Sequence, residues 1–456
     1  MKTFQDLQAV GENEQERMAF VRQVINDHLS SKVYKEAKIA TEYDKGTNVT
    51  IVNFQKLLYT ISGKAVPDNW SANYKIPSRF FHRFTTQQAQ YLLGNGVMWN
   101  SERTGEALGK DFDTKLQRAA KLSLVGGVSF GFFNLDHLEV FSVLEFAPMN
   151  DEENGSLRAG IRFWQIDQQK PLRATLYEED GYTEYIWRYG EGQILQKKRA
   201  YKITYKATEA DGTEIYDMTN YPAFPIVPLY ANDYKQSELV GIREQIDAYD
   251  LIKSGFCDQI DENSLVYWTI TNAGGMDDID LATFVQRMKT VRAAAVSDGE
   301  QVQAHALDIP FEAREAVLDR LRRDLYRDYM ALDTEEIASG AVTATQIKAA
   351  YEPMDSKADD FEYYVIEFIS AILILAGIED APSFTRSKVI NEGEEIQNLV
   401  SAAQFLPEDY VTQKVLEYLG DGDKAEDILR QMADDEVNRN KALLQEALEN
   451  GEGEET

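Results

Sequence analysis

Two long segments with the apolar spacing of an amphipathic helix enclose a shorter segment, residues 263–310. In both, apolar residues recur every third or fourth position, which places them on one face of a helix. The first stripe consists of Leu239, Ile242, Ile246, Tyr249, Ile252, Phe256 and Ile260. The second helix is expected from Phe311 to Ile337, and the residues on its stripe are Val317, Leu318, Leu321, Leu325, Tyr329 and Leu332. The enclosed segment combines strand patterns, a short helix pattern and an Asp298–Gly299 turn, so we expect a small α/β insertion.

The part of the chain before these helices has a different period. Residues 1–30 have helical spacing, whereas residues 127–230 contain short alternating stretches rich in Tyr, Ile, Trp and Thr. Asp180–Gly181 and Asp211–Gly212 fall between such stretches and supply the positive φ values that a tight hairpin requires. The chain is therefore expected to be an α+β protein with an antiparallel β-rich region.

The segment after the second long helix has almost no bulk and no charge. It consists of Ala338, Ser339, Gly340, Ala341, Val342, Thr343, Ala344 and Thr345. A third long helix is expected from near Thr343 to Gly377, with a kink at Pro353. Its most apolar part, Phe368–Ile378, falls short of the ~20 residues that a membrane span needs and is predicted to be a buried helix. Residues 382–390 have a strand pattern.

Recognisable enzyme motifs are missing from the sequence. There is no phosphate-binding loop, and the glycines at residues 126–131 lack the spacing of a dinucleotide site. The single cysteine, Cys257, excludes an intrachain disulfide and a zinc site built from cysteines, and it fits a reducing cytoplasm. The histidines are far apart in the sequence: His28, His82, His137 and His305. The acidic cluster at residues 277–280 is interpreted as a solvated turn. We therefore predict a protein that is not an enzyme, with no catalytic, cofactor-binding or metal-binding residues.

The chain is strongly acidic, with a formal net charge of −30. Proteins that grip nucleic acid by neutralising phosphates carry basic patches, so this charge argues against that class. The acidic excess is marked in residues 391–456, which hold eighteen acidic and five basic side chains. A solvated helical surface explains this count as well as a functional role does.

The order of these elements resembles that of the portal proteins of tailed double-stranded-DNA bacteriophages of the long-noncontractile-tail type. The segment IPSRFFHRFTTQQAQYLLGNGVMW is similar to an early helix of that family, which ends in a glycine before the β-rich region. The segment VPLYANDYKQSELVGIREQIDAYDLIKSGFCDQID is similar to a proline-containing strand that leads into the first long helix of the stem. The similarity covers roughly residues 60–400.

The resemblance implies a portal fold with a β-rich wing, two long stem helices, a small α/β clip, a kinked long helix with a tunnel loop, and a helical crown. The corresponding segments are an N-terminal helical segment (1–60), the wing (61–235), stem helix 1 (236–262), the clip (263–310), stem helix 2 (311–337), the tunnel loop (338–345), the kinked helix with its strand (346–390), and the crown with an acidic disordered tail (391–456).

It also implies a ring of about twelve identical subunits around a channel, because a heterologous contact that closes generates a ring. Residues 338–345 are small and uncharged, as a loop that projects into a bore should be; an ordinary helix–helix turn is the alternative.

Twelve copies of the chain would carry a formal charge of −360 (12 × −30), so an acidic wall is expected to let DNA slide. Arg320, Arg323 and Arg327 share one helical face and form a candidate basic band; pairing with Asp319, Asp324 or Asp328, or with a neighbouring subunit, is the alternative.

The partners implied by the resemblance are other copies of the chain, double-stranded DNA without sequence specificity, the large terminase subunit, a head-completion or adaptor protein, and the major capsid and scaffolding proteins. No membrane partner is expected. In the clip, Tyr267, Trp268 and Met276 are the candidate partner contacts, since aromatic and methionine side chains suit exchangeable partners. The expected location is the portal vertex of the virion, and the host cytoplasm during assembly.

Two other functions fit the sequence. The chain could be a metal-dependent DNA-processing enzyme whose carboxylates come together only in the folded protein. It could also be an oligomeric scaffold without a DNA channel.

Overall fold

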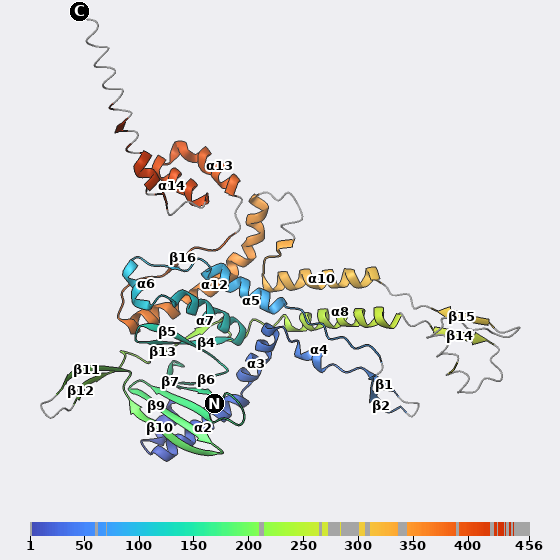
Figure 1. The fold of residues 1–456 in the computed structure, drawn as a ribbon, viewed down its shortest axis with the longest axis horizontal. Coiled ribbons are helices and arrows are strands. Elements are labelled where there is room, and N and C mark those ends of the chain that lie inside the picture. The colour runs from blue at the N-terminus through green and yellow to red at the C-terminus, as the bar shows by residue number, and fades with distance from the viewer. Residues whose placement is uncertain are drawn as a thin grey trace, which may run out of the picture. The chain divides into compact units, whose positions relative to one another are not determined.

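The computed structural model describes residues 2–59, 63–69, 71–208, 214–263, 267–271, 283, 301–305, 311–335, 344–388, 392–419, 424–425, 427–432, 434, 437–438 and 441 (Figure 1). The chain divides into two compact units. The first consists of Met1–Leu332 and Pro353–Ser387, and the second of Asp333–Glu352 and Lys388–Thr456. Both helices and strands are present, which confirms the α+β class.

Four helices begin the first unit, and polar residues cap their N-termini. They are α1 (Phe4–Val10), α2 (Glu14–Ser30), α3 (Lys32–Lys45) and α4 (Val49–Asn53). Thr3, Asn13, Ser31 and Asn48 each accept a hydrogen bond from a backbone N–H of the following turn, which satisfies donors that a helix leaves free.

The largest sheet is antiparallel and has the strand order β10-β9-β8-β7-β6. Its strands are β6 (Phe146–Asn150), β7 (Leu157–Trp164), β8 (Leu172–Glu178), β9 (Gly181–Arg188) and β10 (Glu191–Arg199). Leu7 of α1 and Phe20, Val21 and Ile25 of α2 form one buried cluster with side chains of this sheet. The N-terminal helices therefore complete the core of the β-rich region.

The hairpins of this sheet use left-handed residues at two turns. Glu178 pairs with Gly181, so Glu179 and Asp180 form the β8–β9 turn, and Gly181, with φ 141°, begins β9. Tyr189 (φ 52°) and Gly190 (φ 91°) form the β9–β10 turn. The hairpin predicted at Asp180–Gly181 is confirmed, although its turn lies one residue earlier, at Glu179–Asp180. The other predicted turn, residues 211–212, lies outside the described residues.

A second sheet, with the order β13-β4-β5, lies against helices that include α5 (Phe80–Leu93) and α7 (Phe112–Gly126). Its strands are β4 (Val128–Asn134), β5 (His137–Ser142) and β13 (Ile226–Tyr230). The buried face of α12 (Ala344–Ala376) joins this core through Phe368, and Gly131 of β4 gives that ring room: a Cβ on Gly131 would lie 2.4 Å from Phe368 Cζ. The prediction of a buried apolar helix is confirmed, since Phe368, Ile369 and Ile372 are buried.

Two long helices, α8 (Arg243–Asn263) and α10 (Phe311–Tyr329), lie side by side (Figure 1). Both predicted helices exist, but two of their boundaries are wrong. Helix α8 begins at Arg243 rather than at residue 236, because Gly241 adopts φ 96° in a preceding turn. Helix α10 ends at Tyr329 rather than at Ile337, because Met330 adopts the left-handed conformation, with φ 65°.

The remaining elements are short. They are β1 (Leu57–Tyr59), β2 (Ala65–Pro67), β3 (Val97–Met98), α6 (Glu102–Leu108), β11 (Lys202–Thr208), β12 (Glu214–Thr219), β14 (Tyr267–Thr271), β15 (Gln301–His305) and β16 (Ser383–Phe384). Of the strand predicted at 382–390, residues 382–388 are described, and they contain β16, which pairs with β3. The second unit contains α13 (Glu392–Ala402), a 3-10 turn (Ala403–Phe405) and α14 (Glu408–Tyr418). Among the described helices, none has the length and apolar character needed to cross a membrane.

Candidate nucleic-acid interface

The pair of helices α8 and α10 is tightly packed at one end and open at the other. Near the first unit's core, Ile246 of α8 and Leu325 and Tyr329 of α10 are buried together. At the other end Phe256 and Phe311 meet edge to face, with ring centroids 5.4 Å apart. Several large apolar residues of this pair remain exposed in the single chain: Leu251 (42%), Ile260 (49%), Phe311 (48%) and Val317 (46%). Of these, Leu251 and Val317 line one pocket between the two helices, and exposed apolar residues that lie together are typical of a contact surface.

One face of α8 is polar and buried, and it holds an extended segment, residues 74–78, which we call the strap. The backbone N–H groups of Tyr74, Ile76 and Ser78 donate to Asp258 Oδ1 (2.7 Å), Ser254 Oγ (3.1 Å) and Asp250 Oδ1 (2.8 Å), respectively. Two residues of an extended chain span ~6.6 Å, and four residues of a helix rise ~6 Å along its axis. Every second N–H of the strap can therefore meet every fourth residue of α8 over this length. The strap therefore runs antiparallel to α8 and is fixed along it.

Side chains from the N-terminal helices complete this polar face. Asn48 Nδ2 donates to Asp250 Oδ2 (2.8 Å), and Tyr43 Oη donates to Asp247 Oδ1 (2.5 Å). Lys56 pairs with Asp258 at 3.0 Å, whereas Asp250 is held by neutral donors. Burial raises the pKa of Asp250, and its hydrogen bonds from Asn48 and Ser78 oppose that rise.

The three arginines predicted on one face of α10 differ in their ion pairing. Asp324 pairs with both Arg320 (Nε–Oδ2 3.0 Å) and Arg327 (Nη2–Oδ1 2.7 Å). The hydrogen bond from Arg320 lowers the pKa of Asp324, and the charges of both arginines contribute. Arg323 is exposed, and within the described parts of the chain it has no ion-pair partner. The alternative interpretation, pairing within the helix, therefore holds for Arg320 and Arg327.

The other predicted site residues are only partly described. Residues 338–343 and Met276 lie outside the described residues, while Ala344 and Thr345 are the first two residues of α12. Tyr267 and Trp268 are neighbours in β14, opposite His305 and Ala304 of β15. The structure thus places these two predicted clip residues on one small antiparallel ribbon.

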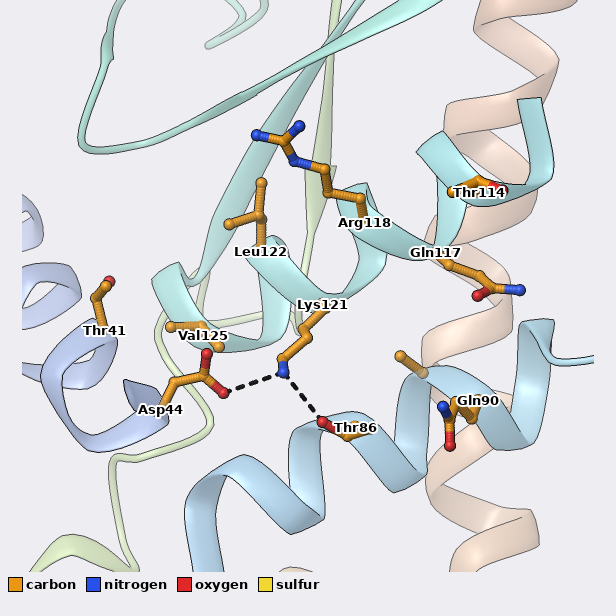
Figure 2. A pocket seen from close by; sticks show the side chains of 11 residues that line it. Thr41, Asp44, Thr86, Gln90, Thr114, Gln117, Arg118, Lys121, Leu122 and Val125 are labelled. Atoms are coloured by element: carbon orange, nitrogen blue, oxygen red, sulfur yellow. Dashed lines mark hydrogen bonds and ion pairs between the residues drawn. The ribbon is translucent and has the colours of Figure 1, made fainter. Parts of the chain in front are cut away.

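A pocket of about 340 Å³ lies between α3, α5 and α7, and the sequence did not predict it (Figure 2). Lys121 of α7 reaches Asp44 of α3 (3.3 Å) and Thr86 of α5 (3.0 Å), so one ammonium group ties the three helices together. His82 Nδ1 lies 3.1 Å from the same Asp44 carboxylate. Since Asp44 compensates the Lys121 charge, we interpret this cluster as a joint between helices. Across the described residues, no group of His, Cys, Asp or Glu side chains is arranged to hold a metal ion.

The amino-acid sequence is similar to proteins of one family. Residues 34–437 match the family model "Phage portal protein, SPP1 Gp6-like". The portal protein of Clostridium phage phiCD119 is 22% identical over 371 residues, which cover 74% of this chain and 80% of that protein. The portal protein of Bacillus phage SPP1 is 22% identical over 385 residues, 76% of this chain and 73% of that protein. The neck of an empty gene transfer agent particle, computed with C6 symmetry, contains a chain with TM-score 0.44 and 12% identity, and the match covers 75% of this chain and 90% of that chain.

Proposed function

Because the chain belongs to the SPP1 Gp6-like family of phage portal proteins, we propose that it forms a ring of about twelve subunits around a DNA channel. Portal proteins of phages are structural components of the virion. The ring would occupy one vertex of the capsid and conduct double-stranded DNA during packaging and ejection. During assembly the protein would be in the host cytoplasm.

The observation that carries this proposal is the exposed apolar surface of the α8–α10 pair. Leu251 of α8 and Val317 of α10 are each more than 40% exposed, and they line one pocket between the two helices. A single copy leaves this surface in water, whereas a neighbouring copy in a ring would cover it. A head-to-tail contact of this kind closes into a ring when its rotation allows.

The charge pattern of α10 supports a channel that does not hold DNA tightly. Each phosphate contact that releases counterions adds to affinity, so a conduit should limit such contacts. Asp324 compensates Arg320 and Arg327, which leaves Arg323 as the exposed cation of the predicted band. Together with the net charge of −30, this favours a wall along which DNA slides.

The remaining roles follow the family. The tunnel loop, residues 338–345, would face the DNA, and the clip, with Tyr267, Trp268 and Met276, would dock the large terminase subunit and later an adaptor protein. Major capsid and scaffolding proteins would contact the ring during head assembly. The energy for packaging would come from the terminase, because the chain has no phosphate-binding loop.

Electron microscopy of the purified protein over a range of concentrations tests the proposal. Rings with an open centre are expected, and inclusion of the scaffolding protein should increase their number. Closed particles without a central opening would instead favour an oligomeric scaffold. Metal-dependent cleavage of plasmid DNA by the same preparation would favour a DNA-processing enzyme.

A further inference from the structure

We propose that the ribbon formed by β11 and β12 is an arm that docks on the neighbouring copy of the chain in the ring. The two strands form a sheet of their own, separate from the five-stranded and three-stranded sheets (Figure 1). The inference rests on the proposed function, since a ring places a second copy beside every copy. It adds a contact between copies that is distant in the sequence from the α8–α10 surface.

The side chains of the ribbon alternate between an apolar face and a polar face. The apolar face consists of two cross-strand pairs: Ile203 with Met218, and Tyr205 with Tyr216. Paired residues, and residues two apart in a strand, lie on the same face of a sheet. Thr204 and Asp217, which separate these residues in the sequence, pair with each other and therefore lie on the opposite face.

The apolar face is exposed in the single chain. Met218 is 62% exposed, and Ile203, Tyr205 and Tyr216 are each at least 44% exposed. The two tyrosine rings meet edge to face, with centroids 6.0 Å apart. A two-stranded ribbon is marginally stable in water by itself, and an exposed apolar face on it is typical of a contact surface.

The root of the ribbon is fixed in the core of the first unit. Tyr201 precedes β11 and Tyr221 follows β12, and both are buried with their ring centroids 5.7 Å apart. Tyr201 Oη donates to the carbonyl oxygen of Glu178 (2.6 Å), and the backbone N–H of Leu135 donates to Tyr221 Oη (2.8 Å). The backbone N–H of Tyr201 also donates to Asn220 Oδ1 (3.1 Å), which ties the two ends of the ribbon together. An arm with a fixed root loses less conformational entropy when it docks.

The segment at this root is basic, whereas the whole chain is acidic. Residues 197–206 contain five basic and no acidic side chains, in a chain of net charge −30. The first two of these cations pair with carboxylates of their own chain. Arg199 and Lys202 instead lie over the rings of Tyr182 (4.8 Å to the centroid) and Tyr221 (4.3 Å), and within the described residues no carboxylate pairs with either cation. A second copy offers an acidic surface that attracts them.

DNA is the other polyanion in the ring, but the apolar face does not suit it. Phosphates are bound by basic and hydrogen-bonding side chains, whereas this face carries no charged side chain. Ile203 and Met218, half of the face, also lack the planar ring on which a base stacks. An apolar centre with a charged margin fits a contact between proteins. Because every copy presents the same arm, another member of the same ring is the partner that can receive all the arms identically.

The experiment compares the full-length protein carrying Ile203→Thr and Met218→Thr with a matched control carrying Ile166→Thr and Leu195→Thr. Both pairs consist of large apolar residues of the β-rich region that are exposed in the single chain. Ring formation is followed by mass photometry over a concentration series. We expect the concentration at half assembly to rise about tenfold or more in the arm variant and to stay within about twofold of the wild type in the control. Circular dichroism and thermal unfolding of the unassembled chain should be alike in all three proteins.

A second measurement does not depend on the loss of apolar surface, and it also serves if the arm variant fails to fold. Met218→benzoylphenylalanine introduces a photo-crosslinking side chain at the end of the apolar face. Illumination of rings that carry it should give a covalent dimer of the chain. Leu195→benzoylphenylalanine is the control and should give no dimer.

An unchanged assembly concentration in the arm variant, or an equal rise in the arm variant and the control, would overturn the inference. It would also be overturned by crosslinks from position 218 to capsid or scaffolding protein in place of the dimer, or by rings of the arm variant that form normally but bind DNA less. Absence of rings in the wild type would refute the proposed function and the arm with it. Wild-type rings together with normal assembly of the arm variant would refute the arm alone.

Discussion

The Asp250 carboxylate of α8 accepts a hydrogen bond from the backbone N–H of Ser78, 2.8 Å away, although the two residues are 172 positions apart in the sequence. This contact is one of three that fix the strap along the helix, and it is the one in which the acceptor is fully buried. Both hydrogen-bond donors to Asp250 are neutral, and the charge of Lys253 adds to their stabilisation of this carboxylate. Helix α8 is thus joined to the N-terminal part of the chain by a polar face.

Replacement of Asp250 by Ala should lower the free energy of unfolding by about 3 kcal/mol, because it leaves the buried donors of Ser78 and Asn48 without partners. Asp250→Asn keeps one acceptor oxygen and should cost about 1 kcal/mol. Chemical denaturation followed by tryptophan fluorescence measures both. Glu244→Ala, an exposed position on the same helix, is the control and should change stability by less than about 0.5 kcal/mol. Equal effects of Asp250→Ala and Glu244→Ala would contradict this account.

The pH dependence of stability should differ between the wild type and Asp250→Asn. Burial raises the pKa of Asp250, so the folded state binds a proton more readily than the unfolded state, in which the pKa is near 3.9. Between these two pKa values the folded protein holds more protons, and stability therefore rises as pH falls. The stability of the wild type relative to Asp250→Asn should accordingly increase as the pH is lowered from 7 towards 4. A relative stability that is constant or falls over this range would show that Asp250 is not the group responsible.

The polar face of α8 explains why part of the structure could not be predicted from the sequence. The apolar stripe of α8 could be predicted, because the spacing of its residues is a property of the helix's own sequence. Asp250, Ser254 and Asp258 have the spacing of a solvated face, and their donors come from residues 74–78, far away in the chain. Burial of a polar residue depends on a partner that the local pattern does not reveal.

The same distinction applies to the candidate site. The pairing of Arg320 with Asp324 was one of two open interpretations, because residues four apart on a helix are neighbours. The predicted start of α8 and end of α10 were wrong, and for α10 the reason is that Met330 is not a residue type that usually adopts the left-handed conformation that ends this helix. The hydrogen bonds of Gln87 and Tyr91 in α5 with Leu332 and Asp355 were not predicted, because the sequence QQAQY gives no signal for partners more than 200 residues away.

The close approach of β4 to α12 predicts a specific pair of substitutions. Gly131→Ala should destabilise the protein by about 2 kcal/mol, because the new methyl group would lie 2.4 Å from Phe368 Cζ. Phe368→Leu removes that contact and should by itself cost about 1 to 2 kcal/mol. The double variant should be more stable than the sum of the two effects implies, and a double-mutant cycle by thermal unfolding measures this coupling.

Gly255→Ala is the matched control, since space is open around the Cβ position of Gly255 in α8. Additive effects of Gly131→Ala and Phe368→Leu would mean that the two residues do not constrain each other.

The ion pairs of Asp324 predict how tightly the assembled ring binds DNA. Asp324→Asn removes the carboxylate shared by Arg320 and Arg327, so the guanidinium group of Arg320 becomes available to phosphates, while Arg327 keeps its pair with Asp328 (3.4 Å). The affinity of rings for a short duplex should rise, and the slope of log affinity against log salt should steepen by about 1. Arg323→Gln should have the opposite effect, with a slope shallower by about 1, because it removes the exposed cation that Asp324 does not compensate. Fluorescence anisotropy across a salt series measures both slopes, and Lys197→Gln, an exposed cation of the β-rich region, should leave them unchanged. If Asp324→Asn and Arg323→Gln shift the slope in the same direction, or not at all, this face of α10 does not meet DNA in the ring.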